Sequence, residues 1–230
     1  NKSSESLLAN NIYINQQANS QFFSNVTTFN GGYVRNNIHV EMNGEYADAK
    51  LYGLYLVDRK QYVDNQVEVI HNQPNTSSNQ LYKGIADDEA GANFNGHVIV
   101  KPHAQGIAAY QINKNIALTD DVKITTHPFL EIYADDVKCS HGATIGQLDE
   151  EAMFYLRSRG ICKRNARMLL MYAFANNVAD YVKIPELRNR LKKKKKKRLS
   201  GELSICDQCI LHCSNKKSFD FEFKIKPFSN

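Results

Sequence analysis

Apolar and polar residues alternate in short segments over residues 1–138, and this period-two pattern indicates β-strands. Turn-forming pairs such as Asn43-Gly44, Asn95-Gly96 and Lys101-Pro102 separate the segments. We expect strands of about 4–7 residues that recur about every 10–15 residues, which is typical of an all-β sandwich, barrel or solenoid. The alternation leaves these three architectures open. The clearest segments are 12–14, 33–35, 38–42, 51–57, 67–70, 97–100, 108–112, 122–124 and 130–133.

The pattern changes near Gly142, and from Asp149 onward it predicts helices. Asp149 is suited to be the N-cap of a first helix that ends at Gly160. A second helix is expected over residues 164–182. Pro185 is suited to the first turn of a third helix, over residues 184–198. The abundant asparagines before residue 100 fit left-handed turns or stacked corners, and AT-rich codon usage is the alternative explanation.

The net charge changes sign near the place where the strand pattern gives way to the helix pattern. Residues 1–150 carry 10 Lys and Arg against 17 Asp and Glu, a balance of −7, whereas residues 151–230 carry 19 against 7, a balance of +12. Six consecutive lysines, Lys192–Lys197, could bind phosphate groups or acidic lipids. Because aromatic residues and recognisable nucleic-acid motifs do not accompany the run, we interpret it as a solvated helix end or tail. Nucleic acid is therefore not an expected partner.

Several classes of function find no support in the sequence. Because no run approaches about 18 apolar residues, a membrane-spanning helix is not predicted. The first residues do not resemble a signal peptide, and because the chain begins at Asn1 rather than Met, we expect its start to be missing or processed. Phosphate-binding and dinucleotide-binding glycine motifs are missing, so we expect this chain to bind no nucleotide.

The five cysteines do not form a disulfide framework, because their number is odd and all of them follow residue 138. A reducing compartment with metal or thiol chemistry fits better. Cys139 and His141 are two residues apart, so on an extended strand their side chains share one face and could ligate a soft metal or an iron–sulfur species. The alternatives are a packed thiol with a hydrogen-bonded imidazole, or a Cys–His nucleophile pair.

A second cysteine cluster contains Cys206, Cys209 and Cys213, with His212 inside it. Its Cys-x₂-Cys pair is a common half of a zinc or iron–sulfur site. It could ligate a metal, or it could be a set of incidental cysteines in a disordered tail.

Residues 130–149, which include Cys139-Ser140-His141-Gly142-Ala143-Thr144, resemble the SufB/SufD family of iron–sulfur cluster assembly proteins, and the SufD members in particular. Residues 154–161, 166–175, 80–84 and 94–96 continue the resemblance, which covers roughly residues 10–200. It implies a mainly β fold, a right-handed parallel β-helix followed by a C-terminal α-helical domain. The implied division is a β-helix core over 1–141, a helical domain over 142–200 and a cysteine-containing tail over 201–230.

The resemblance also implies a function. The chain would be a non-catalytic scaffold subunit that pairs with a SufB-like subunit and docks a SufC-like ATPase, in bacterial cytoplasm or in a plastid-type organelle. A homodimer is an alternative pairing. His141 matches the family histidine that is implicated in building a nascent iron–sulfur cluster, and Cys139 matches a nearby cysteine; the transient cluster would be shared with SufB. The rival hypothesis is a structural β-solenoid adaptor without cluster chemistry of its own.

The resemblance departs from the family at both ends. Family members carry an N-terminal helical region and earlier β-helix turns, so we expect this chain to be truncated. The segment after Ser214 does not resemble the family.

Overall fold

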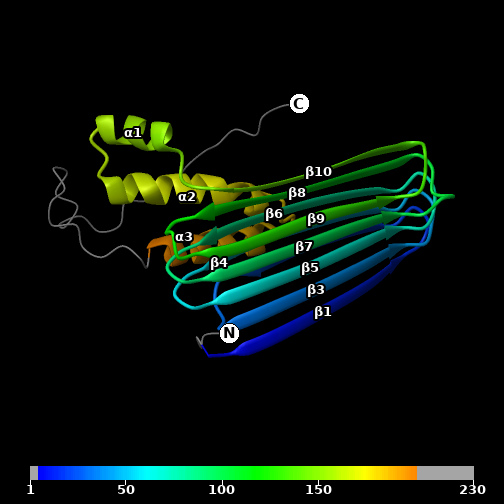
Figure 1. Cartoon of the computed structure of the whole chain (residues 1–230), viewed down its shortest axis with the longest axis horizontal. Helices are drawn as coiled ribbons and strands as arrows, with labels where there is room; N and C mark the ends of the chain where they lie inside the picture. The colour runs from blue at the N-terminus through cyan, green and yellow to red at the C-terminus, as the bar shows by residue number, and fades with distance from the viewer. Residues whose placement is uncertain (1–4, 201–230) are drawn as a thin grey trace.

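The computed structural model describes residues 5–200 and shows a β-solenoid of parallel strands followed by three helices (Figure 1). Odd-numbered strands form one sheet, in the order β1-β3-β5-β7-β9, and even-numbered strands form the other, in the order β10-β8-β6-β4-β2. The solenoid implied by the family resemblance is therefore confirmed. The strands are β1 Leu7–Gln16, β2 Gln21–Thr28, β3 Tyr33–Met42, β4 Asp48–Val57, β5 Tyr62–His71, β6 Ser77–Ala86, β7 Gly91–Val100, β8 Ile107–Ala117, β9 Lys123–Ile132 and β10 Val137–Gly146.

Successive turns stack in register, so side chains one turn apart lie above one another. Val40, Val69 and Val98 form such a column between the two sheets, and all three are fully buried. Polar residues also align: buried Asn36 and Asn65, 29 positions apart, are joined by a hydrogen bond of 3.0 Å. Neighbouring strands of a sheet therefore come from successive turns and not from hairpins, and like residues form columns along the solenoid.

The strands contain 8–11 residues and are longer than the 4–7 expected from the alternation. Strands β2, β6 and β10 were not among the predicted segments. In β6 the inward positions include Ser78 and Gln80, which are buried although they are polar. The interior of a solenoid can hold such side chains because other strands supply hydrogen-bond partners, His71 of β5 for Ser78 and Gln111 of β8 for Gln80. Because these inward positions are polar, the alternation of apolar and polar residues does not predict this strand.

Asparagines occupy several corners of the solenoid. Asn19 and Asn75 have φ angles of 58°, as expected for left-handed turns. Asn72 donates to Asn43 at 2.6 Å one turn below, after β5 and β3 end. The expectation that asparagine would serve left-handed turns and stacked corners is confirmed at these positions.

The three helices are α1 Glu150–Ser158, α2 Lys163–Asp180 and α3 Pro185–Ser200. Asp149 caps α1, and its Oδ1 accepts a hydrogen bond from the Ala152 backbone N–H at 3.0 Å. Gly160 follows the helix with φ +82°, and Pro185 is the first residue of α3. The predicted caps are thus confirmed. Strand β10 continues through Gly142 to Gly146, so the division of the chain at Gly142 stays a prediction.

Helices α2 and α3 cover the outer face of the even-numbered sheet (Figure 1). An apolar layer between them joins Tyr52, Leu54, Leu56, Ile85 and Ile116 of the strands to Met171, Ala175, Val178 and Leu199 of the helices. Where the helices cover it, this sheet is buried on both faces, which explains why residues 51–57 of β4 are all buried. Among the described helices, none is long and apolar enough to cross a membrane.

The lysine run is not uniformly solvated, contrary to the interpretation from its sequence. Lys195 is fully buried: its Nζ donates to Asn176 Oδ1 at 2.9 Å and lies 4.0 Å from the centre of the Tyr172 ring. Lys192 forms an ion pair of 2.6 Å with Asp180. A helix that lies on another helix buries one of its sides whatever charge that side carries, and the long lysine stem packs there.

Candidate functional site

The last described turn of the solenoid consists of β9 and β10, and both strands lie at the edge of their sheets. Within residues 5–200, β10 pairs with β8 alone and β9 with β7 alone. Residues 140–147 are exposed. Pro128 in β9 is compatible with this position, because a proline inside a strand is tolerated chiefly where that strand has a free edge. The turn therefore presents free backbone edges and an uncovered interior.

Cys139 and His141 both belong to β10 and lie in the inward-facing columns of the even-numbered sheet. Cys139 is in register with Ala109 and His141 with Gln111, and both of these partners are buried. The prediction that the two side chains share one face of an extended strand is consistent with this register. His141 is nevertheless exposed, because no further turn of the described chain covers it.

The environment of Cys139 differs from that of His141. Cys139 is half-buried against an apolar cluster that includes Val98, Leu130 and Val137. Burial raises the pKa of the Cys139 thiol, and a hydrogen bond with the Ala109 backbone lowers that pKa by a smaller amount. The thiol is therefore held in its neutral form at physiological pH, and a cation must be present before it can act as a thiolate ligand.

The described residues contain no group of three or more His, Cys, Asp and Glu side chains that could hold a metal ion. Cys139 and His141 amount to two donors, fewer than a soft metal or a cluster usually takes. A complete ligand set around them needs donors from outside the described residues. Cys206, Cys209 and Cys213 lie outside the described residues, so their proposed metal-binding role stays a prediction.

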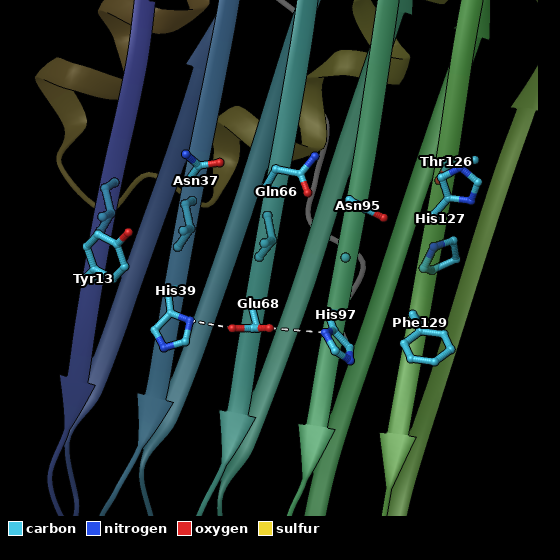
Figure 2. A pocket seen from close by; sticks show the side chains of 15 residues that line it. Tyr13, Asn37, His39, Gln66, Glu68, Asn95, His97, Thr126, His127 and Phe129 are labelled. Atoms are coloured by element: carbon cyan, nitrogen blue, oxygen red, sulfur yellow. Dashed lines mark ion pairs between the residues drawn. The ribbon is translucent and has the colours of Figure 1, made fainter.

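A second polar cluster, which the local sequence patterns did not predict, lies on the outer face of the odd-numbered sheet (Figure 2). His39 Nδ1 lies 2.7 Å from Glu68 Oε2, and His97 Nδ1 lies 3.3 Å from Glu68 Oε1. Tyr13 and Phe129 flank the row, with ring centres 5.9 Å from His39 and 5.2 Å from His97. The five residues line a shallow groove of about 760 Å³. The 29-residue spacing of His39, Glu68 and His97 is the signal that could have revealed this row.

Helix α1 is the least buried element of the helical part. It contains no buried residue, and its contacts are chiefly with α2. Phe154 and Tyr155 expose 74% and 57% of their surface. Both residues belong to α1, which lies at a distance from the solenoid (Figure 1).

Fold and site together define a class of protein: a β-solenoid with an uncovered last turn, two candidate soft-metal donors on that turn, and helices packed on one sheet. The family model for the SUF system FeS cluster assembly SufBD core domain matches residues 1–174. The chain therefore belongs to the SufBD family of iron–sulfur cluster assembly proteins.

Curated relatives agree with this assignment. The iron–sulfur cluster assembly protein SufD of Escherichia coli is 36% identical over 179 residues, which are 78% of this chain and 42% of the relative. A SufBD family protein of Synechocystis is 40% identical over 69% of this chain and 35% of its own length. The chloroplastic protein ABCI7 of Arabidopsis thaliana is 32% identical over 77% of this chain and 38% of its own length. The chain thus spans less than half the length of these relatives.

Proposed function

We propose that this chain is a non-catalytic scaffold subunit of the SUF complex, in which the uncovered last turn pairs with a SufB-like subunit and His141 contributes to a nascent iron–sulfur cluster. The proposal rests on family membership in SUF iron–sulfur cluster assembly. The observation that carries it is the position of His141, in an inward-facing column yet exposed at the end of the described solenoid. A partner that continues the solenoid would enclose this imidazole and complete the ligand set.

Two further features support the partners in this proposal. The free edges of β9 and β10 offer unpaired backbone donors and acceptors to a SufB-like subunit. The exposed Phe154 and Tyr155 on α1 offer an apolar patch to a SufC-like ATPase. The location that fits this role is bacterial cytoplasm or a plastid-type organelle.

The decisive experiment is anaerobic co-expression of this chain with a SufB-like subunit and a SufC-like ATPase, followed by measurement of iron and sulfide in the purified complex. We expect His141→Ala to retain the complex and to lose most of the iron. Cys139→Ala shows whether the half-buried thiol is a second ligand. Ser140→Ala is the matched control, because Ser140 is exposed between the two candidates and points to the opposite face of β10.

Two outcomes would contradict the proposal. An intact complex whose iron content is unchanged in both the His141 and the Cys139 variant would favour the structural adaptor without cluster chemistry. Failure to form a complex with either partner would contradict the scaffold role itself.

Hydrogen exchange tests the pairing surface directly. We expect the amides of β9 and β10 to become protected when the SufB-like subunit binds. Strand β1 is the control, since within the described residues it is also an edge strand, paired with β3 alone at the opposite end of its sheet. Equal protection of β1, or protection of neither end, would argue against pairing through the last turn.

A substitution tests the docking patch. We expect Phe154→Asp to reduce co-purification of the SufC-like ATPase while the SufB-like subunit is retained. Tyr13→Asp is the control, because Tyr13 is 75% exposed on the outer face of the odd-numbered sheet, away from the helices.

A further inference from the structure

Two glutamines lie directly below His141 in the same inward-facing column. Gln80 of β6 is in register with Gln111 of β8, and Gln111 is in register with His141 of β10. Both glutamine side chains are fully buried, and Gln111 Nε2 donates to Gln80 Oε1 at 2.9 Å. The pair is therefore a short amide ladder along the axis of the solenoid.

This ladder leaves one unpaired atom at each end. Gln80 Nε2 and Gln111 Oε1 are buried and have no hydrogen-bond partner among the described residues. Below Gln80 the column continues with Leu51, which has no side-chain acceptor. Above Gln111 it continues with His141, whose ring can donate.

The direction of the ladder determines which atom faces His141. Because the Gln111 amide nitrogen is engaged by Gln80 on the turn below, the amide oxygen lies on the side of the next turn, β10. Gly96 limits movement of this amide, since a Cβ at that position would lie 2.3 Å from Gln111 Nε2. The acceptor is therefore packed in place before any ligand arrives.

We propose that Gln111 is a positioning residue for His141, whose imidazole turns inward and donates one ring N–H to Gln111 Oε1. The exposed ring of His141 can rotate towards this oxygen, and the bond would satisfy a buried acceptor that is otherwise unpaired. A neutral imidazole carries one N–H, so the bond fixes the proton on the inner nitrogen. The outer nitrogen then presents its lone pair to a ligand, as in metal sites where the second ring nitrogen is held by a carbonyl. The consequence for clusters rests on the proposed function; the hydrogen bond does not.

The first test is the tautomer of His141 in the isolated full chain, read from the ¹⁵N chemical shifts of labelled histidines and assigned with His141→Ala. We expect a single neutral tautomer in the wild type at pH 8 and a mixture of both tautomers in Gln111→Met, which keeps the shape but removes the acceptor. Both tautomers in the wild type would overturn the proposal without any reliance on the folding of a variant.

Thr126→Val is the matched control, since Thr126 of β9 faces the same interior and its Oγ1 is also buried without a partner. We expect this variant to retain the wild-type tautomer. If Thr126→Val instead of Gln111→Met produces the mixture, the acceptor is the threonine and the assignment to Gln111 is wrong.

The second test measures iron in the co-expressed complex. We expect Gln111→Met to lower iron retention about 10-fold, the lower limit for removing a residue that orients a metal ligand. A single His141 tautomer in the wild-type chain would support the hydrogen bond. If the iron content of the complex is nevertheless unchanged in His141→Ala, the proposed function is contradicted. A tautomer that is unaffected by Gln111→Met would contradict the hydrogen bond whatever the iron content.

Discussion

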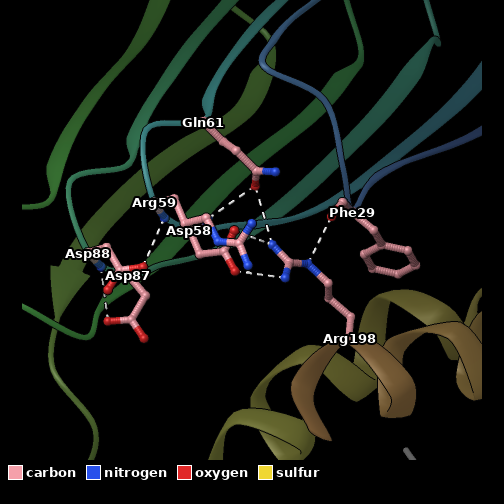
Figure 3. A network of polar contacts seen from close by, with 7 residues as sticks. All are labelled: Phe29, Asp58, Arg59, Gln61, Asp87, Asp88 and Arg198. Atoms are coloured by element: carbon pink, nitrogen blue, oxygen red, sulfur yellow. Dashed lines mark hydrogen bonds and ion pairs between the residues drawn. The ribbon is translucent and has the colours of Figure 1, made fainter. Parts of the chain in front are cut away.

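Arg198, near the end of α3, forms a two-pronged ion pair with Asp58, which directly follows β4 (Figure 3). Arg198 Nη1 lies 2.7 Å from Asp58 Oδ2, and Nη2 lies 2.6 Å from Oδ1. Arg198 Nε also donates to the Phe29 carbonyl at 2.9 Å. One side chain thus fastens the last described helix to two corners of the solenoid, because the guanidinium fork matches a carboxylate and a carbonyl together.

We expect Arg198→Ala to lower the free energy of unfolding by about 3 kcal/mol, because it leaves the largely buried Asp58 carboxylate without its charge partner. Urea denaturation measures this loss, and limited proteolysis should show earlier cleavage in α3. Arg190→Ala, at an exposed position of the same helix, is the control and should change stability by less than about 0.5 kcal/mol. Equal losses of stability in the two variants would contradict a stabilising role of the ion pair between Arg198 and Asp58.

Lys195 should make the stability of the protein depend on pH. Burial lowers the pKa of Lys195 to about 7, although Asp180 raises it in part. The folded pKa lies below that of an unfolded lysine, near 10.5, so between these values the unfolded chain binds more protons and stability rises with pH.

We therefore expect stability to increase between about pH 7 and pH 10, and Lys195→Met to flatten this part of the curve. Thermal melts across this range provide the measurement. Lys194→Met, which changes an exposed neighbour, should retain the slope. An unchanged slope in Lys195→Met would show that another group causes it.

The thiol of Cys139 should react slowly with iodoacetamide at neutral pH. Because burial raises its pKa, little thiolate is present at pH 7, and the alkylation rate should still be rising at pH 9. Mass spectrometry of the peptide that contains Cys139 follows this residue alone. A rate that levels off below pH 8 would mean that the thiolate is stabilised, contrary to the half-buried apolar environment in the structure.

The row of His39, Glu68 and His97 should make a small contribution to stability. Where the two imidazoles are protonated, we expect Glu68→Ala to cost about 1 kcal/mol at low salt and less at high salt, because both contacts are partly exposed. Glu89→Ala is the comparison, since its single contact with Lys60 is long and solvated, and it should have almost no effect. A cost for Glu68→Ala that is independent of salt would contradict an ionic origin.

Two glycines of the even-numbered sheet should respond in opposite ways to alanine. A Cβ on Gly84 would lie 2.0 Å from the Tyr55 ring and 2.5 Å from Asn115, in the buried interior. We expect Gly84→Ala to destabilise the fold by about 2–3 kcal/mol. Gly142 has no atom within 4 Å of such a Cβ, so Gly142→Ala should be nearly neutral in a melting experiment. A large cost at Gly142 in the isolated chain would mean that the last turn is covered.

The sequence alone determined the local structure wherever the signal lies within a few residues. Alternation predicted strands, Asp149 and Pro185 marked helix starts, and the two-residue spacing of Cys139 and His141 placed them on one face of a strand. The resemblance of residues 130–149 to a known family supplied the solenoid, which the alternation had left open.

Only the tertiary structure decided which side chains of successive turns stack on one another, because the register between turns joins residues about 29 positions apart. It placed Gln111 beneath His141, aligned His39 with Glu68, and buried Lys195 within a run of charges. Strand β6 was missed because its inward side chains Ser78 and Gln80 are polar and are hydrogen-bonded by residues of other strands, which no local pattern records. Periodicity determines the elements, and the packing of one turn on the next determines the environment of each side chain.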